Sequence, residues 1–128
     1  MSFSRIAYIQ RLNISQQMSG VIVVTSPEVP GYRIERVLGL VIGSSVRTRG
    51  VGGRIIAGFE AIIGGRGEAY RKELDKARNE AIEELIEKTL RLGGNAVISV
   101  DFETTEVLEG FIVVTAYGTA VKVTPATP

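Results

Sequence analysis

A long segment in the second half of the chain has apolar residues at helical spacing. Between residues 68 and 92 they recur every three or four positions, with charged residues between them, which predicts one amphipathic helix. Gly93 and Gly94 follow directly and predict the end of this helix, because glycine readily adopts the left-handed backbone of a helix C-terminus. The predicted apolar stripe consists of Tyr70, Leu74, Ala77, Ala81 and Leu85, with Ile82, Ile86 and Leu90 beside it.

The opposite face of this helix is charged, with acidic and basic residues four positions apart. In each pair the Glu precedes the basic residue, which is the order that stabilises a helix most. This pattern predicts a solvated helix face with local ion pairs. The pairs are Glu68 with Lys72, Glu84 with Lys88, and Glu87 with Arg91.

Several other segments have the composition or the alternation of β-strands. Residues 21–25 are an apolar β-branched run, residues 32–47 and 95–104 alternate, and residues 111–123 begin apolar on both faces. Residues 5–15 alternate more weakly. In the first alternating segment the pattern places Ile34, Leu38, Leu40 and Ile42 on one face and Val37 and Val41 on the other. In the second it places Ala96, Ile98, Val100 and Phe102 opposite Val97, Ser99, Asp101 and Glu103.

A short helical pattern at residues 54–63 precedes the long one, so the order of elements is β-β-α-α-β-β. This order predicts an α+β fold, in which a small mixed or antiparallel sheet has a short and a long helix on one face. We expect the uncovered face to hold Val37, Val41, Val97 and one side of the last strand. Assembly of several copies of the chain is the simplest way to cover such a face.

Composition excludes several kinds of chemistry. The 128 residues fit one domain, and they include no Cys and no His. The chain therefore lacks thiolate nucleophiles, zinc knuckles and the commonest general base. Only carboxylates remain, and nothing in the spacing of Asp101 and Glu103 argues for acid–base chemistry. We predict no catalytic residues, no metal site and no cofactor; whether the protein is an enzyme stays open, with the composition arguing against it.

Charge and hydropathy add three expectations. No apolar run approaches the ~20 residues of a membrane span, and the N-terminus lacks the apolar core of a signal peptide, so we expect a cytoplasmic protein without a membrane partner. Residues 1–67 hold eight Arg and three Glu, whereas residues 68–128 hold seven basic and eleven acidic residues. A basic sheet beside an acidic helix explains this asymmetry; a basic patch for an anionic partner is the alternative. We expect a thermophile as the source, because the chain has eleven Arg against four Lys and replacement of Lys by Arg is reported in some thermophile families.

Glycines and arginines in the middle of the chain are the candidates for anion binding. The stretch IIGGRGEAY (62–70) lacks the Lys and Ser/Thr of a P-loop and the third glycine of a dinucleotide fingerprint. It serves either as a plain helix junction or as a looser site for a small anionic ligand at the helix N-terminus. The loop RTRGVGGR (47–54) has no interleaved aromatic residue, which argues against nucleic acid. The candidate anion-binding residues are Arg47, Arg49, Arg66, Gly65 and Gly67.

Five segments of the chain match a known pattern in the same order. They are VVTSPEVPGY, LGLVIGSSV, IIGGRGEAY, KARNEAIEELIEKTLRLGGNAVISVDFE and AYGTAV. From Val21 to Val123, about four-fifths of the chain, the sequence resembles the YbjQ-like family of small uncharacterised bacterial and archaeal proteins. The elements GG-x-x-x-Y, LG-x-N-A-V and YGTAV together make the resemblance specific.

The resemblance implies a compact α+β fold that assembles as a ring-like homopentamer. It implies no established activity, and it carries over no catalytic residues. The family is sometimes labelled as heavy-metal-binding, but a chain without Cys and His offers no ligands for such a metal. Family members usually begin near the first apolar strand, and Met18 would be the natural start. We therefore predict an ordered N-terminal extension at residues 1–17, the domain at 18–124 and a tail at 125–128.

The sequence therefore predicts a module of unknown function. We expect a non-catalytic homo-oligomer, a pentamer, that acts as a scaffold or binds a small ligand. The alternative is an anion or phosphate-ligand binder that uses the Arg-rich loop and the helix junction at Gly64–Gly67.

Overall fold

The computed structural model describes residues 20–48, 68–106 and 111–126 of the chain. Several predictions lie outside these residues, among them the strand at 5–15, the short helix at 54–63, the helix junction at Gly64–Gly67 and the extension at 1–17. The described elements are β1 (Ile22–Val23), β2 (Tyr32–Thr48), α3 (Glu68–Arg91), β3 (Ala96–Glu106) and β4 (Phe111–Pro125).

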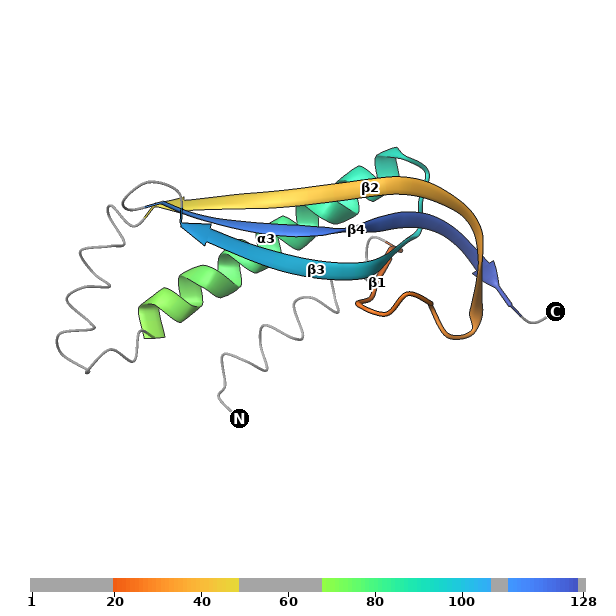
Figure 1. The fold of residues 1–128 in the computed structure, drawn as a ribbon, viewed down its shortest axis with the longest axis horizontal. Helices are drawn as coiled ribbons and strands as arrows, with labels where there is room; N and C mark the ends of the chain where they lie inside the picture. The colour runs from red at the N-terminus through yellow and green to blue at the C-terminus, as the bar shows by residue number, and fades with distance from the viewer. Residues whose placement is uncertain (1–19, 49–67, 107–110, 127–128) are drawn as a thin grey trace.

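The four strands form one curled mixed sheet in the order β1-β3-β4-β2 (Figure 1). The short β1 runs parallel to β3, whereas β4 is antiparallel to both of its neighbours, β3 and β2. In Figure 1, α3 lies behind the sheet and runs along one of its faces. The predicted α+β class, with a long helix on one face of a mixed sheet, is thus confirmed. The order of described elements differs from the prediction by one helix, because residues 54–63 lie outside the described part.

The predicted long helix is confirmed with nearly the predicted bounds. Most of its apolar stripe packs on the sheet: Ala77, Ala81, Ile82, Leu85 and Ile86 are all buried in the main core. The prediction is wrong for Leu90, which is 48% exposed. Two of the predicted ion pairs form, Glu84–Lys88 with 3.0 Å between Oε1 and Nζ, and Glu87–Arg91. The side chains of Glu68 and Tyr70 lie outside the described set.

The helix ends as its two glycines predict. The backbone of Gly93 is left-handed, with φ at 83°. The Gly94 N–H donates to the carbonyl of Thr89 at 2.9 Å, and the Gly93 N–H donates to the carbonyl of Leu90 at 3.0 Å. This pair of bonds is the Schellman motif, which satisfies carbonyls that the last helical turn would leave unpaired.

Two β-bulges in β2 change which residues face α3. The pairing of β2 with β4 shifts register between Ile34 and Arg36 and again between Val37 and Gly39. As a result Leu38 packs against the helix-side core, whereas Val37 pairs with Val121 and points to the opposite face. The predicted shared face of Ile34, Leu38, Leu40 and Ile42 is therefore wrong for Leu38.

The expectation for the uncovered face is correct for Val37 and wrong for two other residues. Val41 and Val97 are buried in the core under α3 rather than on the open face. The prediction fails at Val41 because strict alternation allows no bulge. It fails at Val97 because nothing in the alternation of β3 indicates which of its two faces meets the helix.

β3 is irregular at its centre, which also breaks the predicted alternation. Ser99 has φ at 54°, and the pairing with β4 shifts register between Ile98 and Asp101. Ala96 and Ile98 consequently lie in one core cluster, while Val97 and Val100 lie in the other. The predicted common face of Ala96, Ile98 and Val100 is wrong from Val100 onward, because the bulge adds a residue between the two halves of the strand.

A second, smaller core cluster covers one end of the sheet face opposite α3. Val29, from the turn between β1 and β2, is buried there against Ala96, Ile98, Val121 and Val123. Gly31, with φ at 86°, reverses the chain after this turn, and the Tyr32 N–H donates to the Val29 carbonyl at 3.0 Å. The rest of that sheet face has no described element over it (Figure 1).

Candidate functional site

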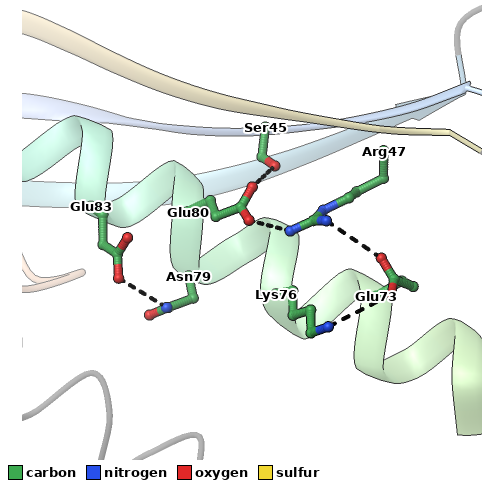
Figure 2. Close-up of polar contacts among 7 residues, drawn as sticks. All are labelled: Ser45, Arg47, Glu73, Lys76, Asn79, Glu80 and Glu83. Atoms are coloured by element: carbon green, nitrogen blue, oxygen red, sulfur yellow. Dashed lines mark hydrogen bonds and ion pairs between the residues drawn. The ribbon is translucent and has the colours of Figure 1, made fainter.

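A cluster of polar side chains joins the end of β2 to the first half of α3 (Figure 2). The Ser45 hydroxyl donates to Glu80 Oε2 at 2.7 Å, and the Arg47 guanidinium binds Glu80 Oε1. A second carboxylate, that of Glu73, lies 3.6 Å from Arg47 Nη1. One cation is therefore held between two anions that lie about two turns apart on one side of the helix, a geometry in which each charge is compensated.

Three further side chains of the same helix complete the cluster. Lys76 lies 4.0 Å from Glu73, and the buried Asn79 donates from Nδ2 to Glu83 Oε1 at 3.1 Å. The described residues around a hollow of about 530 Å³ are Arg47, Lys76, Asn79, Glu80 and Glu83. Two buried atoms of this set, Arg47 Nε and Asn79 Oδ1, have no hydrogen-bond partner within the described part of the chain.

The charge of this cluster does not favour an anionic ligand. Two cations, Arg47 and Lys76, lie among three carboxylates, those of Glu73, Glu80 and Glu83 (Figure 2). Added negative charge would have to compete with Glu73 and Glu80 for the Arg47 guanidinium. Of the five residues predicted to bind an anion, Arg47 alone is described. The other four, Arg49, Gly65, Arg66 and Gly67, lie outside the described residues.

Sequence reasoning missed Ser45, Glu73 and Glu80 as partners of Arg47. The signal was present: Ser45 and Arg47 are two positions apart on a strand, and Glu73 and Glu80 are seven apart on a helix, so each pair shares a face. What the sequence does not contain is the placement of the helix against that strand.

The available donors do not fit a heavy metal. Soft metal ions prefer thiolate and imidazole ligands, and the chain has no Cys and no His. In the part of the chain that the structure describes, no group of three or more carboxylates is close enough together to hold a metal ion.

The sheet face opposite α3 carries a row of exposed apolar side chains. Residues paired across an antiparallel ladder share a face, so this face is traced through the pairs Val37–Val121, Leu40–Thr119, Ile42–Tyr117 and Val46–Val113. Val37, Leu40 and Val46 are 63%, 67% and 59% exposed. We call the exposed apolar residues of β2 on this face the β2 stripe: Ile34, Val37, Leu40, Ile42 and Val46.

Acidic residues on β3 border the same face. Asp101 and Glu103 pair with Tyr117 and Thr115 of β4, and the Tyr117 hydroxyl lies 3.4 Å from Asp101 Oδ2. The negative charge of Asp101 raises the pKa of Tyr117, and partial loss of hydration, the hydrogen bond to Asp101 and the charge of Glu103 add to the shift.

This contact gives a test of the described geometry. Asp101→Asn is expected to lower the pKa of Tyr117 towards its ordinary value, because the nearest negative charge is removed. The measurement is an ultraviolet titration of each protein, with the Tyr117→Phe variant subtracted to isolate this one tyrosine. Glu28→Gln, which removes an exposed carboxylate that does not contribute to the shift of Tyr117, is the control. An unchanged Tyr117 titration in Asp101→Asn would contradict the contact.

The fold and this surface define a class of protein, a small α+β domain. One described helix covers one face of its curled sheet, and most of the other sheet face has no described element over it. A family model named YbjQ_1 and described as "Putative heavy-metal-binding" matches residues 21–124. The chain belongs to this YbjQ-like family, as its motifs indicated.

Relatives agree with this assignment, and a solved structure has the same fold. A UPF0145 protein of Sulfurisphaera tokodaii is 45% identical over 111 residues, covering 87% of this chain and 97% of the relative. A UPF0145 protein of Streptomyces avermitilis is 43% identical over 108 residues, covering 84% and 89%. The crystal structure of a DUF74-family protein of unknown function from Pediococcus pentosaceus has the same fold, with a TM-score of 0.57, 23% identity and coverage of 82% and 99%.

The expectation of no membrane partner concerns α3, the helix that the structure describes. No helix in the described residues is both long and apolar enough to span a membrane. The cytoplasmic location stays a prediction.

Proposed function

We propose that the protein is a non-catalytic module that assembles with copies of itself and acts as a scaffold or as a small-ligand-binding unit. The observation that carries this proposal is the β2 stripe. It places five apolar side chains on one face of a strand at the edge of the sheet, and no described element covers them. Exposed apolar surface of this kind is typical of interfaces.

The bulges of β2 support the same interpretation. Without them, strict alternation from Ile34 would place Arg36 on the open face. The register shifts bring Val37 there instead and pair Arg36 with Lys122, so the stripe stays free of charge along its length. A surface that only met water would gain nothing from excluding this arginine. A second copy of the chain is the occupant that we propose, in a ring of five, the number that the family resemblance implies.

The proposal is tested by the mass of the protein in solution. Light scattering after gel filtration at micromolar concentration is expected to give a multiple of the single-chain mass. Val37→Glu and Val46→Glu are expected to lower that mass towards a single chain, because each would bury a carboxylate in the apolar interface. Leu90→Glu, at an exposed apolar position on α3 and outside the β2 stripe, is the control. A wild-type protein with the mass of one chain would contradict the proposal.

The anion-binding alternative stays a prediction. Arg47, its one described residue, is paired with two carboxylates, so the described geometry gives this alternative no added support.

A further inference from the structure

Both edges of the described sheet have backbone with no described strand beside it. β2 forms one edge over its whole length. At the other edge β1 pairs with β3 only at Ala96 and Val97, and the segment that follows β1 bonds to Ser99 and Val100. The part of β3 around Asp101 and Phe102 therefore has no described strand on the side away from β4. Sheet edges of this kind are surfaces on which a strand of another chain can pair.

The register of the sheet places Ile42 on the β2 edge and Asp101 on the β3 edge at the same level along the strands. Tyr117 of β4 pairs with Ile42 on one side and with Asp101 on the other. Because β2 and β3 are both antiparallel to β4, they run parallel to each other. If the β3 edge of one copy lies beside the β2 edge of the next copy without a shift, Asp101 and Phe102 therefore arrive next to Ile42.

The surface around Ile42 is hollowed and carries two cations, Lys88 and Arg91, each of which also pairs with a carboxylate of α3, that of Glu84 or Glu87. Lys88 Nζ donates to the Ile42 carbonyl at 2.7 Å, which shows that this carbonyl points outward from the sheet edge. A hollow of about 410 Å³ lies here between β2 and the end of α3. It is lined by Leu40, Val41, Ile42, Lys88, Arg91 and Leu92.

The surface around Phe102 is complementary to that hollow. Phe102 pairs with Ala116, a residue of the core under α3, so its ring lies on the helix side of the sheet, as the hollow does. Its side chain is 37% exposed. Its N–H donates to Asp101 Oδ1 at 2.8 Å, which holds the Asp101 carboxylate at the strand edge. β3 carries acidic residues and no basic one.

We propose that copies of this chain join head to tail: the edge of β3 at Asp101–Phe102 docks on the β2 edge of the next copy. The Phe102 ring enters the hollow beside Val41 and Leu92, and the Asp101 carboxylate pairs with Lys88. The two surfaces are different and complementary, so each copy carries one of each, and repetition of this heterologous contact gives a ring when the rotation between copies closes. This inference rests on the proposed self-assembly and names one pair of surfaces that meet, in addition to the β2 stripe.

A charge exchange tests the pairing. Asp101→Lys alone and Lys88→Asp alone are each expected to weaken association about 30-fold or more, because each places two like charges opposite one another in the interface. The double variant Asp101→Lys/Lys88→Asp restores opposite charges and is expected to recover most of the wild-type mass. Controls with the same changes of charge at exposed positions on α3, on neither sheet edge, are Glu83→Lys and Lys72→Asp. Mass is measured by light scattering, with circular dichroism as the check on folding.

A second variant tests the contact made by the aromatic side chain of Phe102. Phe102→Ala is expected to weaken association at least about tenfold with an unchanged circular dichroism spectrum, since an exposed ring contributes little to the core of a single chain. If both single charge variants and Phe102→Ala assemble as the wild type does, or if the double variant fails to recover, this interface is wrong while self-assembly stands. A wild-type protein that is a single chain overturns the proposed function itself, and this inference with it.

Discussion

Gly43→Ala is expected to destabilise the fold by about 3 kcal/mol or to prevent folding, although alanine is otherwise the more favourable residue in a strand. Gly43 lies on the face of β2 that meets α3. A Cβ atom built on it would lie 2.0 Å from the Ala81 carbonyl oxygen and 2.8 Å from the Leu85 backbone nitrogen. Both neighbours are helix backbone, which cannot rotate away as a side chain could. The whole helix would have to move off the sheet, and the core formed by Ala77, Ala81 and Leu85 would open with it.

Chemical denaturation followed by circular dichroism measures this effect. Ser44→Ala, at the neighbouring position on the open face, is the matched control and is expected to change the free energy of unfolding by less than about 0.5 kcal/mol. A Gly43→Ala protein as stable as the wild type would show that α3 does not approach β2 this closely.

Gly43 also shows how far the sequence predicts this fold. A glycine inside an alternating segment indicates either a bulge or a close backbone approach, and β2 contains one of each. Gly39, with φ at 125°, lies at the second register shift, and Gly43 lies under the helix. The type of irregularity at each position could not be predicted, because it depends on which strand face the helix covers.

The same limit explains the errors in the faces of the strands. Alternation fixes the face of each residue only while the register is unbroken, and a single bulge reverses every assignment beyond it. The predicted faces of Leu38 and Val100 are wrong for this reason. The long helix is predicted closely because its period and its terminal glycines are local signals that need no knowledge of a partner.

The candidate site was predictable to a smaller extent. Arg47 stands out for its charge and for the glycine-rich segment that follows it, although it lies on β2 and not in the predicted loop. Its partners come from a helix that is 26 to 33 residues further along the chain. Pairing over such a separation depends on the packing of α3 on β2. The exposed apolar face could be anticipated as a feature, whereas its composition required the register of β2 on β4.

Asn95 is the second position with a large expected effect. It follows the helix-terminating glycines in the motif GGNAV, and all of its polar groups are bonded. Its backbone N–H donates to the Val121 carbonyl at 3.1 Å, and its carbonyl accepts from the Ile22 N–H at 2.9 Å. Its side chain donates from Nδ2 to the Val123 carbonyl at 2.9 Å and accepts from the Val123 N–H at 2.8 Å. Asn95 therefore forms hydrogen bonds to both β1 and β4 directly after the end of the helix.

Asn95→Ala is expected to lower the free energy of unfolding by about 2–4 kcal/mol. The change leaves both backbone groups of the buried Val123 without partners, and each unpaired buried group costs about 1–3 kcal/mol. Asn79→Ala is the matched control: its amide makes one bond, to Glu83, and its Oδ1 already lacks a partner among the described residues, so the loss is expected to be clearly smaller. Equal losses in the two variants, measured by denaturation, would contradict this role of Asn95.

Asn95→Asp separates the two hydrogen bonds by pH. The ionised Asp can accept from the Val123 N–H, but its other oxygen would face the Val123 carbonyl, and two acceptors repel each other. The protonated Asp can make both bonds, so the fold would favour the protonated form and raise the pKa of this carboxyl. A group whose pKa is raised on folding stabilises the protein below its unfolded pKa and loses that contribution as the pH increases. Asn95→Asp is therefore expected to approach wild-type stability at acidic pH and to fall behind it towards neutrality, whereas the deficit of Asn95→Ala should not depend on pH in this way.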